Sequence, residues 1–200
     1  MKGVRQLFAL IVVFAAFGCS GGGGSAGAPT TPTTSASAGE GTATVLLTDS
    51  PFSDAQAVLV TFTEVSAHRS GGGWETIPFS PPSASRTCDL KKLEGAQDIL
   101  GTGPLPQGHY TQIRLMVSEA TLYFDNPAGG PACAPAIAAP AGASAPLEIP
   151  SGEVKLNREF DVTSGDVTTI TLDFEGERSI HQTGSVTFMM KPVIAVVSVQ

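Results

Sequence analysis

The stretch LPQGHYTQIRLMV, residues 105–117, contains the clearest strand signal in the chain. Its side chains Ile113, Leu115 and Val117 fall on one face, and the intervening residues fall on the other. This period of two predicts a half-buried β-strand. A tyrosine opens this strand, with a glycine two residues before it and a leucine further upstream. This spacing is similar to that of a tyrosine corner, in which the tyrosine hydroxyl bonds to the upstream backbone. We expect Tyr110 to form this bond; the alternative is a ring packed on the outer face of a sheet.

The same period of two recurs along most of residues 42–200. Segments 154–162 and 170–174 alternate between apolar and polar side chains, and turns that contain glycine and proline separate such segments. Because no long helical pattern accompanies them, we predict an all-β domain over residues 42–200. We expect an antiparallel β-sandwich of the immunoglobulin or prealbumin kind with at most one short helix. A stretch rich in proline and alanine near residues 126–146 is interpreted as an insertion.

Two local signals add detail to this domain. The alternation breaks before Val65, and a β-bulge at Thr63–Glu64 would restore it by adding one residue. Asp89 is placed to cap a short helical segment in which Leu93 and Leu100 line one side.

The chain begins with a basic and then an apolar segment. Lys2 and Arg5 precede eleven apolar residues at positions 7–17. Eleven residues of helix rise about 16 Å, roughly half of the hydrocarbon core of a bilayer. Residues 1–18 are therefore interpreted as an export signal.

A cysteine follows this segment, and Gly18-Cys19 resembles the lipobox of bacterial lipoproteins. The resemblance implies a diacylglyceryl group on the Cys19 sulfur, cleavage before this residue and acylation of the new amino terminus. Ala16 and Phe17 differ from the leucine and the small residue usual in a lipobox. Ser20, in place of aspartate, is typical of lipoproteins of the outer membrane. The alternative is an ordinary export signal with an accidental cysteine.

Residues 19–41 consist mainly of glycine, serine, threonine, proline and alanine, with Glu40 as the one charged side chain. Such a composition supplies no core, and we expect a disordered tether. The whole chain has 11 Lys and Arg against 18 Asp and Glu, a net charge of −7. Because this negative charge repels phosphate backbones, nucleic acid is not an expected partner.

Four segments, taken together, resemble a known family. They are LTDSP (47–51), GHYTQIRL (108–115), LDFEGERSI (172–180) and KPVI (191–194). Their succession over roughly residues 41–198 is similar to the domain-of-unknown-function family 4382 of bacteria and archaea, many of whose members are lipoproteins. The family has no assigned activity, so the resemblance supports the fold and implies no mechanism.

Cys88 and Cys133 form an even pair in an exported domain, which suggests a disulfide. Such a bridge would tether the insertion near residues 126–146; the alternative is two free thiols. The histidines at 68, 109 and 181 are dispersed, without a nucleophile elbow or metal-ligand spacing. We therefore expect no enzyme activity and no cofactor. The least favoured alternative is a hydrolase that uses Asp49 with a histidine.

Acidic residues give one weak metal candidate. Asp173, Glu175 and Glu177 alternate, and three carboxylates on one face or edge would suit calcium. The alternative is a set of solvated carboxylates. Asp49 and Asp54 form a second acidic group, in which Asp49 could simply bond the backbone of the SPFS turn, residues 50–53.

Two residues are candidates for binding. Arg114 lies mid-strand, where it could pair with Asp173 or Glu64, or belong to a polar sheet face that receives a carboxylate or a sugar. Trp74, the single tryptophan, is expected in the core, with stacking on a sugar ring as the alternative. The sequence thus predicts a lipid-anchored, non-catalytic module of the cell envelope, either structural or binding an unknown envelope protein. The alternative is a carbohydrate-binding module, which rests on analogy of fold.

Overall fold

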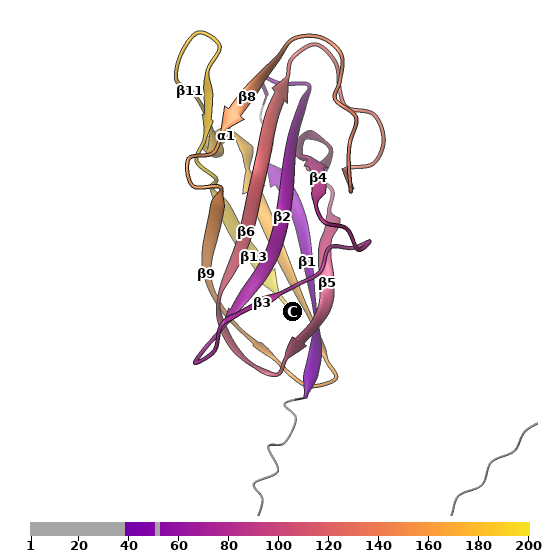
Figure 1. Cartoon of the computed structure of the whole chain (residues 1–200), viewed down its shortest axis with the longest axis vertical. Coiled ribbons are helices and arrows are strands. Elements are labelled where there is room, and N and C mark those ends of the chain that lie inside the picture. The colour runs from indigo at the N-terminus through magenta and orange to yellow at the C-terminus, as the bar shows by residue number, and fades with distance from the viewer. Residues whose placement is uncertain (1–38, 51–52) are drawn as a thin grey trace, which may run out of the picture. The chain divides into compact units, whose positions relative to one another are not determined.

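The computed structural model describes residues 39–50 and 53–200, and most of these residues lie in β-strands. The strands form two sheets arranged as two layers (Figure 1), so the prediction of an all-β domain is confirmed. The predicted signal segment 1–18, the lipidation candidate Cys19 and the tether as far as residue 38 lie outside the described residues.

The first sheet has four strands in the order β13-β10-β1-β5. Their bounds are β1 Glu40–Ser50, β5 Asp98–Pro106, β10 Val167–Glu175 and β13 Ile194–Val199. β1 pairs with β5 in antiparallel fashion but with β10 in parallel. The expectation of a purely antiparallel sandwich is therefore wrong for this pair. Parallel neighbours need a long crossover connection, and here β5 and most strands of the second sheet lie between β1 and β10 in the chain.

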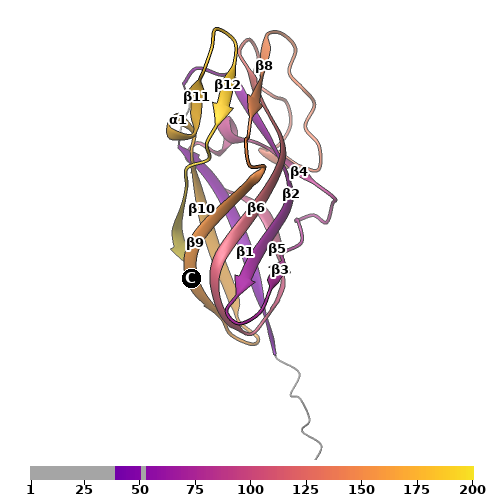
Figure 2. The same cartoon turned by 60° about the vertical axis from the view of Figure 1, so that its left-hand side comes forward.

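The second sheet has nine strands, with β6 and β2 at its centre (Figure 2). β6 (Gly108–Tyr123) pairs along its length with β2 (Ala57–Arg69). The remaining strands are β3 Trp74–Thr76, β4 Arg86–Asp89, β7 Cys133–Ala134, β8 Ser144–Glu148, β9 Glu153–Val162, β11 Ile180–Gln182 and β12 Phe188–Met190. β9 and β8 flank β6, and β3 and β4 flank β2. β8 and β12 are a second parallel pair.

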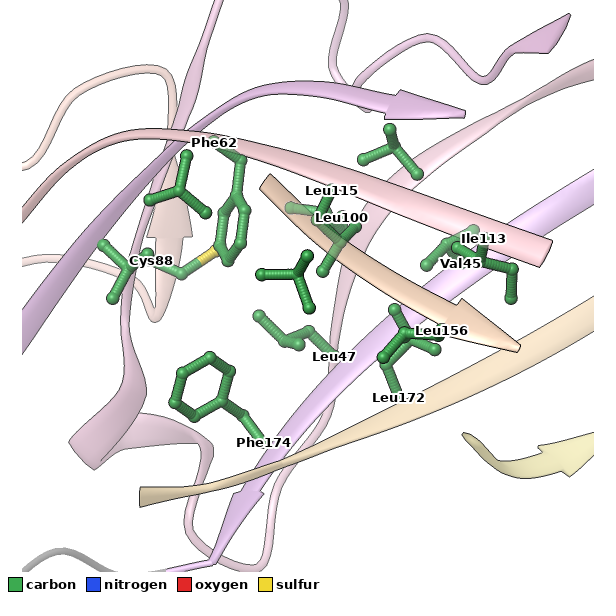
Figure 3. Close-up of a cluster of buried hydrophobic side chains, with 14 of the residues drawn as sticks. Val45, Leu47, Phe62, Cys88, Leu100, Ile113, Leu115, Leu156, Leu172 and Phe174 are labelled. Carbon is green, nitrogen blue, oxygen red and sulfur yellow. The ribbon is translucent and has the colours of Figure 1, made fainter. Parts of the chain in front are cut away.

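The core fills the space between the two sheets (Figure 3). Alternate residues of each strand point inward, as the period of two predicts. Val45 and Leu172 from the first sheet meet Phe62, Leu115 and Leu156 from the second.

The predicted bulge is present in β2. Phe62 lies opposite Val117 and Glu64 lies opposite Met116, so Thr63 is the additional residue. Because of this insertion, Val65 returns to the core and is fully buried.

The expected helical segment is a single turn. Asp89 caps a 3₁₀-helix over Leu90–Leu93, and its carboxylate accepts a hydrogen bond from the Lys91 amide at 3.2 Å. Leu100 lies in strand β5 instead of on a helix. One unforeseen α-helical turn, α1 (Gly176–Ser179), connects β10 to β11. Neither turn of the described part is long or apolar enough to cross a membrane.

A disulfide joins Cys88 to Cys133, which confirms the predicted bridge. It lies where β4 pairs with β7, and Cys133 belongs to the insertion near residues 126–146. On either side of Cys133 in the chain, Ala128 and Ile137 pack with Leu59 on the outer side of the nine-stranded sheet. The covalent bond thus anchors a segment that has few apolar side chains of its own.

Candidate functional site

Arg114 and Trp74 contact each other on the outer face of the nine-stranded sheet. The guanidinium carbon of Arg114 lies 4.3 Å from the centroid of the Trp74 ring. Arg114 faces outward because its neighbours Ile113 and Leu115 point into the core. Trp74 opens β3 opposite His68 of β2, and β2 lies between β3 and β6, so the ring reaches across β2 to Arg114. A cation over an aromatic face is attracted by the negative potential of the ring.

Three polar side chains contact the Arg114 guanidinium. Its Nη2 pairs with Glu64, its Nε donates to the Ser66 hydroxyl at 3.1 Å, and its Nη1 lies 3.8 Å from Glu153. The hydrogen bond from Arg114 lowers the pKa of Glu64 below its usual value, and the bond from Ser66 makes a smaller contribution in the same direction. We name this group the Trp74–Arg114 surface; its members are Glu64, Ser66, His68, Trp74, Arg114 and Glu153.

The structure distinguishes between the alternatives left open for these residues. Arg114 pairs with Glu64, whereas Asp173 lies in the other sheet. Trp74 is half-buried outside the core, so the expectation of a core tryptophan is wrong. The reason is local, because Ile77 takes the inward position on this segment and is 1% exposed. An odd spacing of three between Ile77 and Trp74 places the two side chains on opposite faces.

Further polar side chains flank this surface. The Gln112 amide donates to Asn157 at 2.8 Å, and Lys155 pairs with Glu153 at 3.2 Å. The His68 ring meets Trp74 edge-on, with 5.2 Å between centroids. The result is a preformed arrangement of aromatic, amide and charged groups of both signs.

Asp49 belongs to a separate place, at the end of β1. Its side chain is buried, with 5% exposed, and one oxygen, Oδ1, has no hydrogen-bond partner among the described residues. Burial raises the pKa of Asp49 to about 8, with smaller contributions from Glu94 and Asp173, while a hydrogen bond from the Gly176 backbone opposes the rise. That backbone bond comes from α1, whereas the sequence suggested the SPFS turn, of which residues 51–52 lie outside the described part.

The segments around Asp49 are joined through Ser179 of α1. The Ser179 hydroxyl accepts a hydrogen bond from the Val193 amide at 2.8 Å, and its carbonyl accepts one from Lys191 at 2.8 Å. Three segments that are distant in sequence therefore meet here: LTDSP with Asp49, LDFEGERSI with Ser179, and KPVI with Val193. The fourth segment, GHYTQIRL, carries Arg114 in the other sheet.

The family model described as Domain of unknown function (DUF4382) matches residues 40–192. This chain belongs to that family. The match includes every strand from β1 to β12, and so contains both Asp49 and the Trp74–Arg114 surface. No curated protein and no solved structure matches the chain.

The three carboxylates proposed for calcium have different partners in the DUF4382 domain. Asp173 accepts from the Ser50 hydroxyl at 3.4 Å, and Glu175 pairs with Arg178 at 2.6 Å. Glu177 accepts from the Ser53 amide at 2.9 Å. Within residues 39–50 and 53–200, no three acidic, histidine or cysteine side chains are grouped for metal binding.

The histidines of the DUF4382 domain are also dispersed. His68 contacts Trp74 and lies 3.3 Å from the Thr111 hydroxyl, and His109 pairs with Asp161 at 2.9 Å. His181 is exposed on β11. None of these contacts joins a histidine to Asp49.

Proposed function

We propose that this DUF4382 domain is a non-catalytic binding module of the cell envelope, and that its Trp74–Arg114 surface contacts an envelope protein. The observation that supports this proposal is the stacking of Arg114 on Trp74 in an outward-facing cluster. Tryptophan and arginine are enriched among residues that dominate binding energy at protein interfaces.

The order of this cluster also favours a binding role. Arg114 is held by Glu64 and Ser66 before any partner arrives. Less conformational entropy is then lost on association, because the guanidinium and the indole already occupy their positions. Lys155 and Glu153 add charges of both signs at the side of the cluster, which favours a partner with a matching charge pattern.

We further propose that a lipid on Cys19 anchors the module at the outer membrane, on its periplasmic or surface face. Support comes from the apolar segment 7–17, the glycine before Cys19 and the serine after it. Several acyl chains would hold the protein at a membrane, because each buried CH₂ contributes about 0.8 kcal/mol.

Radiolabelled palmitate tests the anchor. The full chain should incorporate the label, Cys19→Ala should abolish incorporation, and Ser20→Ala should retain it. Labelling that persists in Cys19→Ala would exclude lipidation at this cysteine.

Photo-crosslinking in intact cells tests the binding surface. A photoreactive residue in place of Lys155, whose side chain is 50% exposed, should yield one crosslinked product with an envelope protein. Trp74→Ala should abolish this product without unfolding the domain, whereas His181→Ala, a change at an exposed histidine far along the chain, should leave it intact. Crosslinking that is unaffected by Trp74→Ala would refute the role of this surface.

Carbohydrate recognition is the second candidate function. It is favoured by the placement of the Gln112 and Asn157 amides on the same sheet face as the Trp74 ring. Aromatic rings flanked by amides suit the apolar faces and hydroxyl groups of sugars. Glycan-array binding by the full chain that is lost in Trp74→Ala, without any protein crosslink, would favour this candidate.

A further inference from the structure

The four-stranded sheet presents an outer face without charged side chains over three successive rows. In the first row Leu46 of β1 lies between Thr171 of β10 and Ile99 of β5. Thr171 in turn lies beside Ser198 of β13, so this row crosses all four strands.

The next two rows continue the pattern toward the start of β1. Thr44 lies between Thr169 and Thr102, and Thr42 lies between Val167 and Pro104. The residues of β1 that alternate with these, Ala43 and Val45, point into the core and are fully buried. We name the outward residues of the three rows the uncharged face.

Exposed apolar side chains concentrate on this sheet. Among the described residues, four large apolar side chains are exposed. Their exposed fractions are 39% for Ile99, 61% for Val167, 73% for Val186 and 54% for Val197. Three of them belong to strands of this sheet, and the fourth, Val186, lies between β11 and β12. Two of the three, Ile99 and Val167, lie in the rows described above and add apolar surface to the uncharged face.

Four of the six hydroxyl groups of the uncharged face already have a partner within the sheet. The hydroxyls of Thr44 and Thr102 lie 2.9 Å apart, and Ser198 donates to Thr171 at 3.1 Å. Covering these groups would therefore leave few polar atoms without a hydrogen bond, which removes the main penalty for burying polar surface.

We propose that two copies of this chain associate through the uncharged face, sheet against sheet. The chain carries a net charge of −7, so two copies repel each other through most arrangements of their surfaces. Contact through this face leaves the acidic residues of the adjoining rows, Glu40 and Asp173, at its edges, and a two-fold axis would set the same face of both copies together. The Trp74–Arg114 surface lies on the other sheet and stays accessible in such a dimer.

The size of the face predicts a weak dimer. Strands lie about 4.8 Å apart and rise about 3.3 Å per residue, so the three rows cover roughly 300 Å² on each copy. This is less than the roughly 800 Å² per partner of a standard interface. We therefore expect association at high concentration, and more strongly where both copies are confined to one surface.

Sedimentation equilibrium of the full chain tests this proposal between about 10 μM and 1 mM, the range in which a weak interface dissociates. The weight-average mass should rise with concentration toward twice the 20.4 kDa of one chain. Val167→Glu, on the face, should weaken association at least fivefold, because each dimer gains two like charges. Val186→Glu is the matched control, the same change at an exposed valine away from the face, and should shift association less than twofold.

Three results would overturn the proposal: a monomer at every concentration, an unchanged dimer in Val167→Glu, or equal weakening by Val186→Glu. The apolar segment 7–17 is present in all variants, so its own association cancels from the comparison. Trp74→Ala should leave the dimer unchanged, which separates failure of this proposal from failure of the proposed binding function.

Discussion

The hydroxyl of Tyr110 donates a hydrogen bond of 2.8 Å to the carbonyl oxygen of Pro106, four residues earlier in the chain. This bond joins the start of β6 to the end of β5 across the intervening turn. The Tyr110 ring is fully buried and stacks on Phe160 of β9, with 5.2 Å between centroids. The residue therefore ties together three strands that belong to both sheets, and the predicted tyrosine corner is confirmed.

Tyr110→Phe should lower the free energy of unfolding by about 1–2 kcal/mol. The substitution keeps the stacked ring but removes the donor for the Pro106 carbonyl. Urea unfolding measures the change, and Tyr123→Phe, at a half-buried tyrosine with no hydroxyl contact among the described residues, is the matched control. Equal losses in the two variants would show that the Pro106 bond contributes nothing.

Asp49→Asn should reduce the pH dependence of stability. The folded domain keeps the Asp49 proton up to about pH 8, whereas the unfolded chain loses it near 3.8. The stabilising contribution of the protonated carboxyl is complete below about pH 4, and it is lost as the pH rises toward 8. For one proton this slope is at most about 1.4 kcal/mol per pH unit.

Urea unfolding at pH 5, 6, 7 and 8 measures this slope, which should be smaller in Asp49→Asn than in the unmodified chain. Asp166→Asn changes an exposed carboxylate and should keep the original slope. If Asp49→Asn also keeps that slope, Asp49 is ionised in the folded domain.

Ser179→Ala should destabilise the domain by about 1–3 kcal/mol. The substitution leaves the half-buried Val193 amide without its acceptor, at the point where α1 holds the segment before β13. Thermal unfolding and hydrogen exchange at residues 191–199 measure the effect. Ser185→Ala, at an exposed serine, should change neither quantity, and normal exchange in Ser179→Ala would show that this contact does not hold the segment.

Replacing Cys88 and Cys133 together by serine should lower stability by up to about 4 kcal/mol. This is the chain-entropy value for a bridge between residues 45 positions apart. Hydrogen exchange should accelerate at residues 126–146, because the insertion loses its covalent anchor. An unchanged urea midpoint in the double variant would contradict the expectation.

Features set by neighbouring residues were predictable from the sequence. The spacing of Leu105, Gly108 and Tyr110 indicates the corner, and the broken alternation before Val65 indicates the bulge at Thr63. Each of these signals lies within a few residues, where backbone geometry and side-chain period act directly. The arginine on the outer face followed in the same way from alternation along β6.

Features that depend on register between distant strands were not predictable. The burial of Asp49 follows from the parallel pairing of β1 with β10 and from the turn at Gly176, which lie far along the chain. The three uncharged rows likewise exist only because this register aligns Leu46 with Thr171. The expectation of a core Trp74 is wrong for another reason. It rests on the general preference of tryptophan for cores, whereas in this segment Ile77 takes the inward position.

The parallel pairing of β1 with β10 also constrains the order in which the domain is completed. β1 ends at Ser50 and its neighbour β10 begins at Val167, so a long intervening segment must be synthesised before these strands meet. Contacts between residues this far apart form late, because closing a long loop costs entropy before the contact is made. Because β10 begins at residue 167 of 200, the four-stranded sheet stays incomplete until nearly the whole chain is available.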